Sequence, residues 1–235
     1  IRPRDWSSDV CSSDLIGEPT PAHPVVPGHP DFPEILELDA QKGGKNARWH
    51  TDVTFVTSPP AASVLVGDVI PSYGGDTLWA DLRSAYERLS PALRDALTGL
   101  EAVHRITPLA YWGEPFDSAL TRDDAQKLYD DSLKVLPVIH PVVRVHPITK
   151  RKALFVNPVY TQRFDGMTEE ESKPLLSYLF AHATKPEFTC RLQWEVGTLA
   201  LWDNRCVLHL AINDYDGSRR LLHRTTVAGE TPIHP

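Results

Sequence analysis

The residues of this sequence best suited to chemistry are a histidine and an aspartate one residue apart, His50 and Asp52. Successive side chains of an extended backbone point to opposite faces, so these two would share a face. An imidazole and a carboxylate on one face can bind the same metal ion. Short motifs of this kind match by chance more often than not. The hypothesis of a metal site therefore requires a third ligand elsewhere.

The best candidate for that ligand among the ten histidines is His209. It follows a polar turn at residues 202–205 and lies near the start of an apolar stretch, which predicts a buried position on a strand. Two histidines and one carboxylate, with further positions open, are the ligand set of non-haem Fe(II) oxygen chemistry. The alternative is an ordinary core histidine.

Two arginines farther along, Arg220 and Arg224, would share a face of a regular strand because their positions differ by an even number. Burying an arginine inside a barrel costs free energy unless its guanidinium group pairs with an anion. Guanidinium binds planar anions with paired hydrogen bonds. The alternative is an outward-facing pair that forms ion pairs with Asp214 or Asp216.

The elements that must position these residues are mostly short strands separated by turn signals. We expect strands over residues 34–40, 62–70, 77–79, 100–106, 142–145, 153–157, 191–196, 199–203, 207–212 and 221–227. Helices are expected over residues 82–89, 91–99 and 121–135, and after a capping box that begins at residue 168. This pattern favours a mainly β fold with external helices (α+β), an antiparallel double-sheet barrel or jelly roll.

Composition places the chain among soluble globular proteins, with 41% hydrophobic and 23% charged residues. A net charge of −7 without a basic cluster argues against a nucleic-acid partner. The longest apolar runs fall far short of the roughly 20 residues that cross a bilayer, so no membrane partner is expected. Three cysteines at unrelated spacings form no disulfide framework, which predicts a cytoplasmic location.

The first fifteen residues differ from the rest because they have neither a helical nor a strand period. We expect residues 1–15 to be a non-native leader, a processing scar rather than part of the fold. A disordered leader rich in Ser and Asp is the alternative. Residues 16–235 contain no internal repeat or long linker, so they are expected to form one domain that lacks its natural N-terminus.

Together these motifs resemble the taurine dioxygenase family of Fe(II)- and 2-oxoglutarate-dependent oxygenases. The resemblance begins near residue 16 and extends to the C-terminus, and it implies a double-stranded β-helix fold. It rests on residues 50–52, 74–79 and 202–205, and on His209, Arg220, His223 and Arg224.

The resemblance also implies a role for each motif residue. His50, Asp52 and His209 would bind Fe(II) and so form the catalytic centre. Thr77 and Arg220 would bind the distal carboxylate of 2-oxoglutarate, and dioxygen would be the second cosubstrate.

The primary substrate would be a small anionic molecule. The resemblance implies that its anionic group meets Arg224, Asn46, the backbone amide of Val53 and His23. Donors without a carboxylate among them suit a tetrahedral anion with three acceptor oxygens. Residues 109–112 do not resemble the Ser-Phe pair of taurine-specific members, which favours a tail larger or more apolar than that of taurine.

We therefore predict an enzyme of sulfur metabolism that hydroxylates an alkyl sulfonate or alkyl sulfate ester. The products would be sulfite or sulfate and an aldehyde, with succinate and CO2. The alternatives are an aryloxyacetate-type dioxygenase, a jelly-roll zinc hydrolase with the same three ligands, and an inactive fragment or binding module of the same fold. A homo-oligomer is left open.

Overall fold

The computed structural model describes residues 17–41, 47–106 and 122–235. The predicted leader, Asn46 and the pocket-wall segment at residues 109–112 lie outside the described residues, so those predictions stay predictions. No helix within the described ranges is long and apolar enough to span a membrane.

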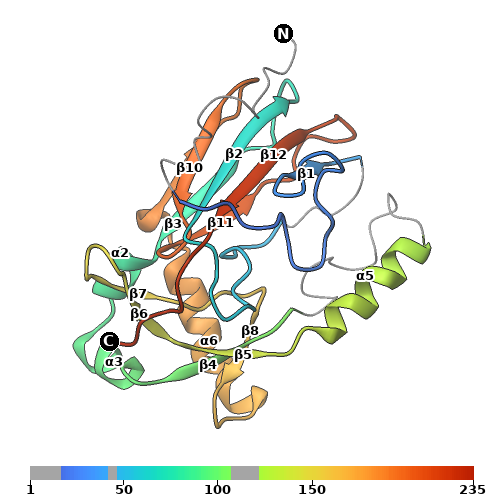
Figure 1. Cartoon of the computed structure of the whole chain (residues 1–235). Coiled ribbons are helices and arrows are strands. Elements are labelled where there is room, and N and C mark those ends of the chain that lie inside the picture. Colours follow the sequence, from blue (N-terminus) through green and yellow to red (C-terminus); the bar gives the residue numbers. More distant parts are fainter. Residues whose placement is uncertain (1–16, 42–46, 107–121) are drawn as a thin grey trace.

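The larger sheet is antiparallel, and its four strands lie in the order β1-β12-β2-β10. In β2, buried and half-buried residues alternate from Ser63 to Gly67, as expected for a strand with one face toward a core. Figure 1 shows this sheet in the upper part of the molecule, built from segments far apart in the chain. Its strands are β1 (Leu36–Asp39), β2 (Ala62–Val69), β10 (Leu199–Asp203) and β12 (Leu221–Val227).

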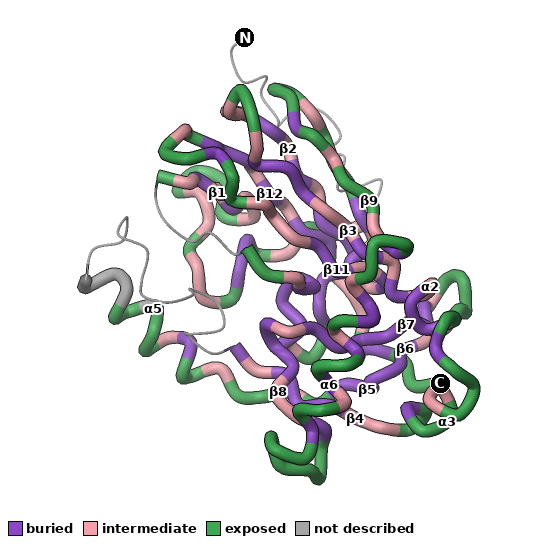
Figure 2. Tube along the Cα trace, turned by 180° about the vertical axis from the view of Figure 1, so that it is seen from behind, coloured by how far each residue is buried: buried purple, intermediate pink, exposed green. Residues whose placement is uncertain are grey.

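The second sheet, in the order β11-β3-β9, is also antiparallel. Side chains from both sheets line one pocket, so the two sheets are the walls around it. The second sheet contains β3 (Thr77–Asp81), β9 (Thr189–Leu192) and β11 (Val207–Ala211). Figure 2 shows buried residues along β3 and β11 of this sheet and along β2 and β12 of the larger sheet, whereas β9 contains none.

Two small antiparallel sheets, β5-β4-β8 and β6-β7, lie below the larger sheet in Figure 1. The largest core cluster contains residues of these sheets and of the helices, among them the buried leucines Leu82, Leu154 and Leu179. The strands are β4 (Glu101–His104), β5 (Val138–Pro141), β6 (Val143–Val145), β7 (Lys152–Leu154) and β8 (Thr161–Phe164).

The helices lie outside the sheets, as predicted. The predicted capping box is confirmed: Thr168 Oγ1 accepts from Glu171 N at 3.2 Å, and Thr168 N donates to the Glu171 carboxylate at 2.8 Å. Ser90 caps the helix that starts at Pro91. The helices are α2 (Leu82–Glu87), α3 (Pro91–Leu97), α5 (Arg122–Lys134), α6 (Glu169–Ala183) and the 3-10 helix η1 (Pro186–Phe188).

One predicted strand is misplaced, and two strands were not predicted. The strand expected over residues 191–196 lies earlier, at Thr189–Leu192, because β9 pairs with β3 and the chain then leaves the sheet. Sequence analysis missed β5, which ends in a proline, and β8, which has only four residues. Both are held by pairing with β4 rather than by a strong local pattern.

Candidate metal centre

One pocket between the sheets contains most of the predicted site residues. Predicted residues on its wall are His23, His50, Asp52, Val53, Thr77, His209, Arg220 and Arg224.

The three predicted metal ligands lie together in this pocket, and each is buried. His50 and His209 face each other across an isolated antiparallel bridge, with N···O distances of 3.0 and 2.7 Å. The Nε2 atoms of both histidines lie 3.8 Å from Asp52 Oδ1. Two imidazoles and one carboxylate therefore converge on one point, as the hypothesis of a shared metal site requires.

The predicted strand alternation of His50 and Asp52 explains this convergence only in part. Residues 48–55 do not form a regular strand: only His50 bridges β11, and the chain turns from Asp52 onward. Val53 has φ of 53°, in the left-handed region that β-branched residues rarely adopt. The turn, together with the bridge to β11, therefore brings the aspartate to the histidines.

Two side chains that sequence analysis did not single out hold Asp52 in place. Ser63 Oγ donates to Asp52 Oδ2 at 2.7 Å, which leaves Oδ1 facing the histidines. Asn204 accepts from Asp52 N at 3.0 Å and donates to Asp52 O at 3.1 Å. Asn204 is part of the motif at residues 202–205, whereas Ser63 carried no signal because it belongs to none of the motifs that pointed to chemistry.

The protonation of the three residues fits a metal ion. Burial lowers the pKa of His50, and it lowers the pKa of His209 to about 3, so both imidazoles are neutral at pH 7. Burial alone would raise the pKa of Asp52, but the Arg224 charge and the two histidines hold it well below its usual range. His50 Nδ1 lies 2.8 Å from the Arg48 carbonyl and so donates to it, which leaves the Nε2 lone pair free for a cation.

A second group of potential ligands does not fit a metal. His146, Asp203 and Cys206 lie near one another, but Arg205 donates to both carboxylate oxygens of Asp203 at 2.8 Å. His146 Nδ1 accepts backbone N–H groups, so its Nε2 carries the proton donated to Asp203 at 2.8 Å. Burial raises the pKa of Cys206 to about 11, so its thiol stays protonated. This cluster is a structural hydrogen-bond network within the described residues.

Arg220 lies in the pocket with Thr77, as predicted. It precedes β12 rather than lying on it, and the register shifts between Leu221 and Leu222, so strand alternation does not explain its position. Its Nε donates to the Gly75 carbonyl at 2.9 Å, and its Nη2 lies 3.5 Å from Thr77 Oγ1. Gly75 has φ of 73°, and a Cβ there would lie 2.9 Å from Arg220 Cδ.

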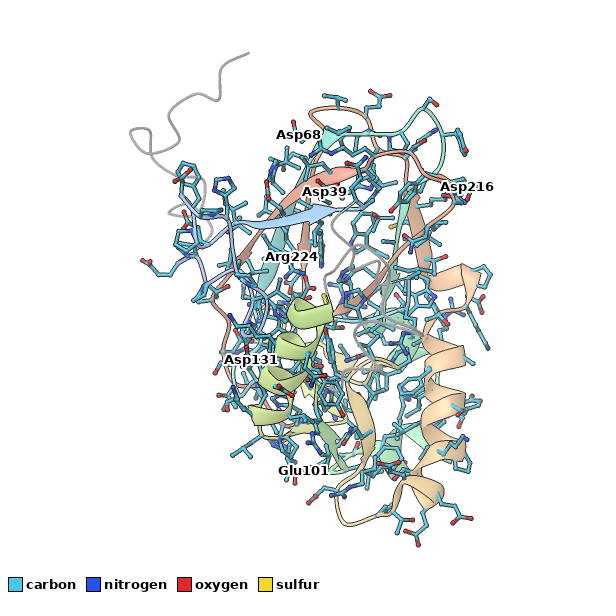
Figure 3. The ribbon with its side chains drawn as sticks, turned by 90° about the vertical axis from the view of Figure 1, so that its right-hand side faces the viewer. Asp39, Asp68, Glu101, Asp131, Asp216 and Arg224 are labelled. Carbon is cyan, nitrogen blue, oxygen red and sulfur yellow. The ribbon has the colours of Figure 1, made fainter. Side chains whose placement is uncertain are left out.

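Arg224 extends into the same pocket from β12. Its Nη1 donates to Asp52 Oδ1 at 2.6 Å. The sequence predicted substrate donors with no carboxylate among them, but the Asp52 carboxylate lies beside Arg224. The alternative of outward-facing arginines is wrong, because Arg220 and Arg224 are both only 6% exposed. Figure 3 shows Arg224 inside the molecule and Asp216 at its edge.

His23 lies on the pocket wall, as predicted. Its Nδ1 accepts from Val25 N at 3.1 Å and from Val26 N at 3.0 Å, so the proton resides on Nε2. Burial and the nearby Arg224 charge lower its pKa to about 3. His23 is therefore a neutral donor at pH 7.

Two aromatic residues of the segment at residues 48–55 and one of β3 lie outside the pocket lining. Phe55 is fully buried in the core, and Trp49 and Trp79 pack against core clusters rather than lining the pocket. Trp202 and Tyr160 line it instead, and the Trp202 ring lies 5.0 Å from that of His209.

A double-sheet antiparallel fold with two histidines and one carboxylate in a buried pocket is the arrangement typical of non-haem Fe(II) oxygenases. The chain belongs to the taurine catabolism dioxygenase TauD, TfdA family, whose sequence model matches residues 12–226. The predicted family is therefore confirmed.

Curated relatives agree with this assignment. An alpha-ketoglutarate-dependent sulfate ester dioxygenase of Pseudomonas putida is 38% identical over 93% of this chain and 71% of its own length. An alkylsulfatase of Acinetobacter baylyi is 38% identical over 93% of this chain and 68% of its own. A 2,4-dichlorophenoxyacetate dioxygenase of a Burkholderia species is 33% identical over 83% of this chain and 64% of its own. The predicted enzyme class, a 2-oxoglutarate-dependent dioxygenase, is confirmed.

A solved structure confirms the fold class. A taurine dioxygenase from Burkholderia xenovorans is 41% identical to this chain and superposes with a TM-score of 0.77. The superposition covers 96% of this chain and 72% of the other.

Proposed function

We propose that this enzyme oxidises an alkyl sulfate ester or alkyl sulfonate, using Fe(II), 2-oxoglutarate and dioxygen. The observation that carries the proposal is that one pocket joins the histidine-aspartate-histidine set to two buried arginines. In this proposal the metal ligands are His50, Asp52 and His209.

When bound, Fe(II) would supply dioxygen activation coupled to the oxidation of 2-oxoglutarate to succinate and CO2. The chain's own residues would orient both organic molecules and exclude water. For a sulfate ester, one oxygen atom of dioxygen enters succinate and the other enters the substrate carbon beside the ester oxygen. The hydroxylated ester then breaks its C–O bond to sulfate, and it yields an aldehyde, sulfate and one proton.

We assign the distal carboxylate of 2-oxoglutarate to Arg220 and Thr77. Arg220 is buried, and the two hydrogen bonds that it donates within the described part of the chain go to Gly75 and Thr77, not to a carboxylate. Burying a guanidinium group without a bound anion costs free energy. A carboxylate of the cosubstrate would therefore suit the position beside Arg220 and Thr77. Asp214 supports the arrangement by accepting from Gly75 N at 2.7 Å.

We assign the anionic group of the primary substrate to Arg224, with His23, the Val53 amide and Asn46 as further donors. Arg224 and His23 line the pocket, and the fixed tautomer of His23 makes its Nε2 a donor at pH 7. Three acceptor oxygens of a sulfate ester or sulfonate can use several such donors at once, whereas a planar carboxylate offers two. The names of the Pseudomonas and Acinetobacter relatives support the sulfate ester.

The decisive experiment measures succinate, sulfite and sulfate together. The purified enzyme is supplied with Fe(II) and 2-oxoglutarate, and is tested on short alkyl sulfate esters, alkyl sulfonates, taurine and an aryloxyacetate. We expect sulfate or sulfite to form in equal amount to succinate, with moderate-length alkyl substrates turning over faster than taurine. Faster turnover of the aryloxyacetate than of every sulfur substrate would favour the aryloxyacetate alternative.

A further inference from the structure

Two nitrogen donors lie within hydrogen-bond distance of the Thr77 hydroxyl. Trp194 Nε1 donates to Thr77 Oγ1 at 2.9 Å, and Arg220 Nη2 lies 3.5 Å from the same oxygen. A threonine hydroxyl has two acceptor lone pairs and one hydrogen to donate. With both lone pairs directed at nitrogen donors, its own hydrogen must point elsewhere. Thr77 lines the pocket, so that hydrogen is available to a ligand there.

Trp194 also borders the arginine. Its ring centroid lies 6.0 Å from the Arg220 guanidinium carbon, and the Tyr215 ring lies at the same distance. Trp194 is 4% exposed and belongs to a core cluster with Leu65 and Leu222, so its indole has little freedom to move. It lies in the loop between β9 and β10, and no motif of the sequence pointed to it.

We propose that Trp194 is a positioning residue for the cosubstrate: its indole N–H fixes the Thr77 hydroxyl as a donor to the distal carboxylate of 2-oxoglutarate. This inference rests on the proposed function, which assigns that carboxylate to Thr77 and Arg220. Without the indole N–H, the Thr77 hydrogen can turn toward other acceptors, and the site loses part of its preference for a carboxylate. The indole acts through Thr77 and does not touch the reacting atoms.

The test is Trp194→Phe, which removes the N–H but keeps an aromatic ring beside Arg220. Binding is measured by anaerobic calorimetry on the Mn(II)-loaded enzyme, with 2-oxoglutarate as the ligand. We expect the Kd to rise roughly fivefold to tenfold, the range for loss of one orienting hydrogen bond. In turnover assays the KM for 2-oxoglutarate should rise by a similar factor, with kcat nearly unchanged.

The chain offers a matched control in Trp79→Phe. Trp79 packs against the same core cluster, but its Nε1 is buried without a hydrogen-bond partner among the described residues. The same substitution there removes an N–H that orients nothing, so the Kd for 2-oxoglutarate should change less than twofold. A rise as large as that of Trp194→Phe would show that core disturbance alone is responsible, and would overturn the inference.

Two further measurements separate positioning from a general packing effect. 2-Oxopentanoate has the same carbon chain but no distal carboxylate, so its affinity should be nearly equal in wild type and Trp194→Phe. In a Thr77→Val background, Trp194→Phe should add no further loss of 2-oxoglutarate affinity. An equal loss for both 2-oxo acids, or an undiminished loss in the Thr77→Val background, would overturn the inference.

The same data distinguish this inference from the proposed function. Failure of the wild-type Mn(II)-loaded enzyme to bind 2-oxoglutarate would contradict the proposed function itself. Normal wild-type binding with no effect of Trp194→Phe would contradict only the role of Trp194.

Discussion

Asp52 and Arg224 are joined through the oxygen that faces the metal centre. Arg224 Nη1 lies 2.6 Å from Asp52 Oδ1, and the same oxygen lies 3.8 Å from the Nε2 atoms of both His50 and His209. The other carboxylate oxygen accepts from Ser63. The arginine assigned to the substrate anion therefore borders the metal centre directly, so substrate and metal would be held next to each other.

The first prediction concerns the metal ligands. His209→Ala removes one of three converging groups, so it should lower the affinity for Fe(II) or Mn(II) by at least a hundredfold and abolish 2-oxoglutarate turnover. Metal content after dialysis and calorimetric Mn(II) titration are the measurements. His182→Ala is a control for loss of a buried histidine, because His182 Nε2 bonds the Ala85 carbonyl away from the pocket. Stoichiometric tight binding by His209→Ala would contradict the assignment.

The second prediction separates the two arginines. Arg220→Ala should weaken 2-oxoglutarate binding by about 2 to 5 kcal/mol, because it removes a buried charge-assisted contact. Arg224→Ala should raise the KM for the sulfur substrate but leave substrate-free 2-oxoglutarate decarboxylation largely intact. Steady-state kinetics for each ligand are the measurement.

A surface arginine provides the control for this pair. Arg151 bonds Glu87 with both side chains about half exposed, so Arg151→Ala should alter neither constant. The same kinetic defect in Arg220→Ala and Arg224→Ala would show that the division of roles is wrong.

The third prediction tests the support of Asp52. Ser63→Ala should lower Mn(II) affinity roughly tenfold, because partners that orient a metal-binding carboxylate typically contribute this much. The fold should persist, since only one buried hydrogen bond is lost. Ser58→Ala removes an exposed serine hydroxyl that contacts Thr231, and it should leave Mn(II) affinity unchanged. Wild-type Mn(II) affinity in Ser63→Ala would exclude the supporting role.

The fourth prediction concerns acid stability. His104 is fully buried, with Nδ1 2.9 Å from Thr54 Oγ1, Nε2 3.4 Å from Thr161 Oγ1 and the His140 ring 5.2 Å away. Burial lowers its pKa well below 6.5. Because the unfolded state binds the proton more readily, the free energy of unfolding falls as pH drops below 6.5, by about 1.4 kcal/mol per histidine at pH 5.5.

Urea unfolding at pH 8 and pH 5.5 measures this loss. In His104→Gln the decrease between the two pH values should be smaller than in wild type by about 1.4 kcal/mol. His234→Gln is the control, because it removes an exposed imidazole rather than a buried one. An equal decrease in wild type and His104→Gln would contradict the assignment of a neutral buried His104.

The residues that gather in the pocket were easier to predict from the sequence than the geometry that brings them together. The types and order of residues pointed to His50, Asp52, His209 and Arg220. Strand alternation, however, explains neither the approach of Asp52 to the histidines nor the position of Arg220. Asp52 reaches the histidines through a turn with Val53 at positive φ, and Arg220 lies before a register shift. Such departures depend on pairing with distant strands, which no local pattern encodes.

Supporting residues were harder to predict than ligands. Ser63 and Trp194 contact Asp52 and Thr77 only when β2 and the loop between β9 and β10 come beside these residues in the folded chain. Helix starts were easier, because the capping signals at Ser90 and Thr168 are local. The cytoplasmic location, the non-native leader and the roles of Asn46 and residues 109–112 stay predictions.

The most direct test of the central claim follows oxygen and sulfur in one reaction. A short alkyl sulfate ester is incubated with Fe(II), 2-oxoglutarate and isotopically labelled dioxygen, and sulfate, succinate and aldehyde are quantified. We predict equal amounts of sulfate and succinate, one labelled oxygen in succinate, and no sulfate when either 2-oxoglutarate or dioxygen is omitted. Sulfate release that continues without 2-oxoglutarate and dioxygen, and yields an alcohol in place of the aldehyde, would identify a hydrolase and contradict the account.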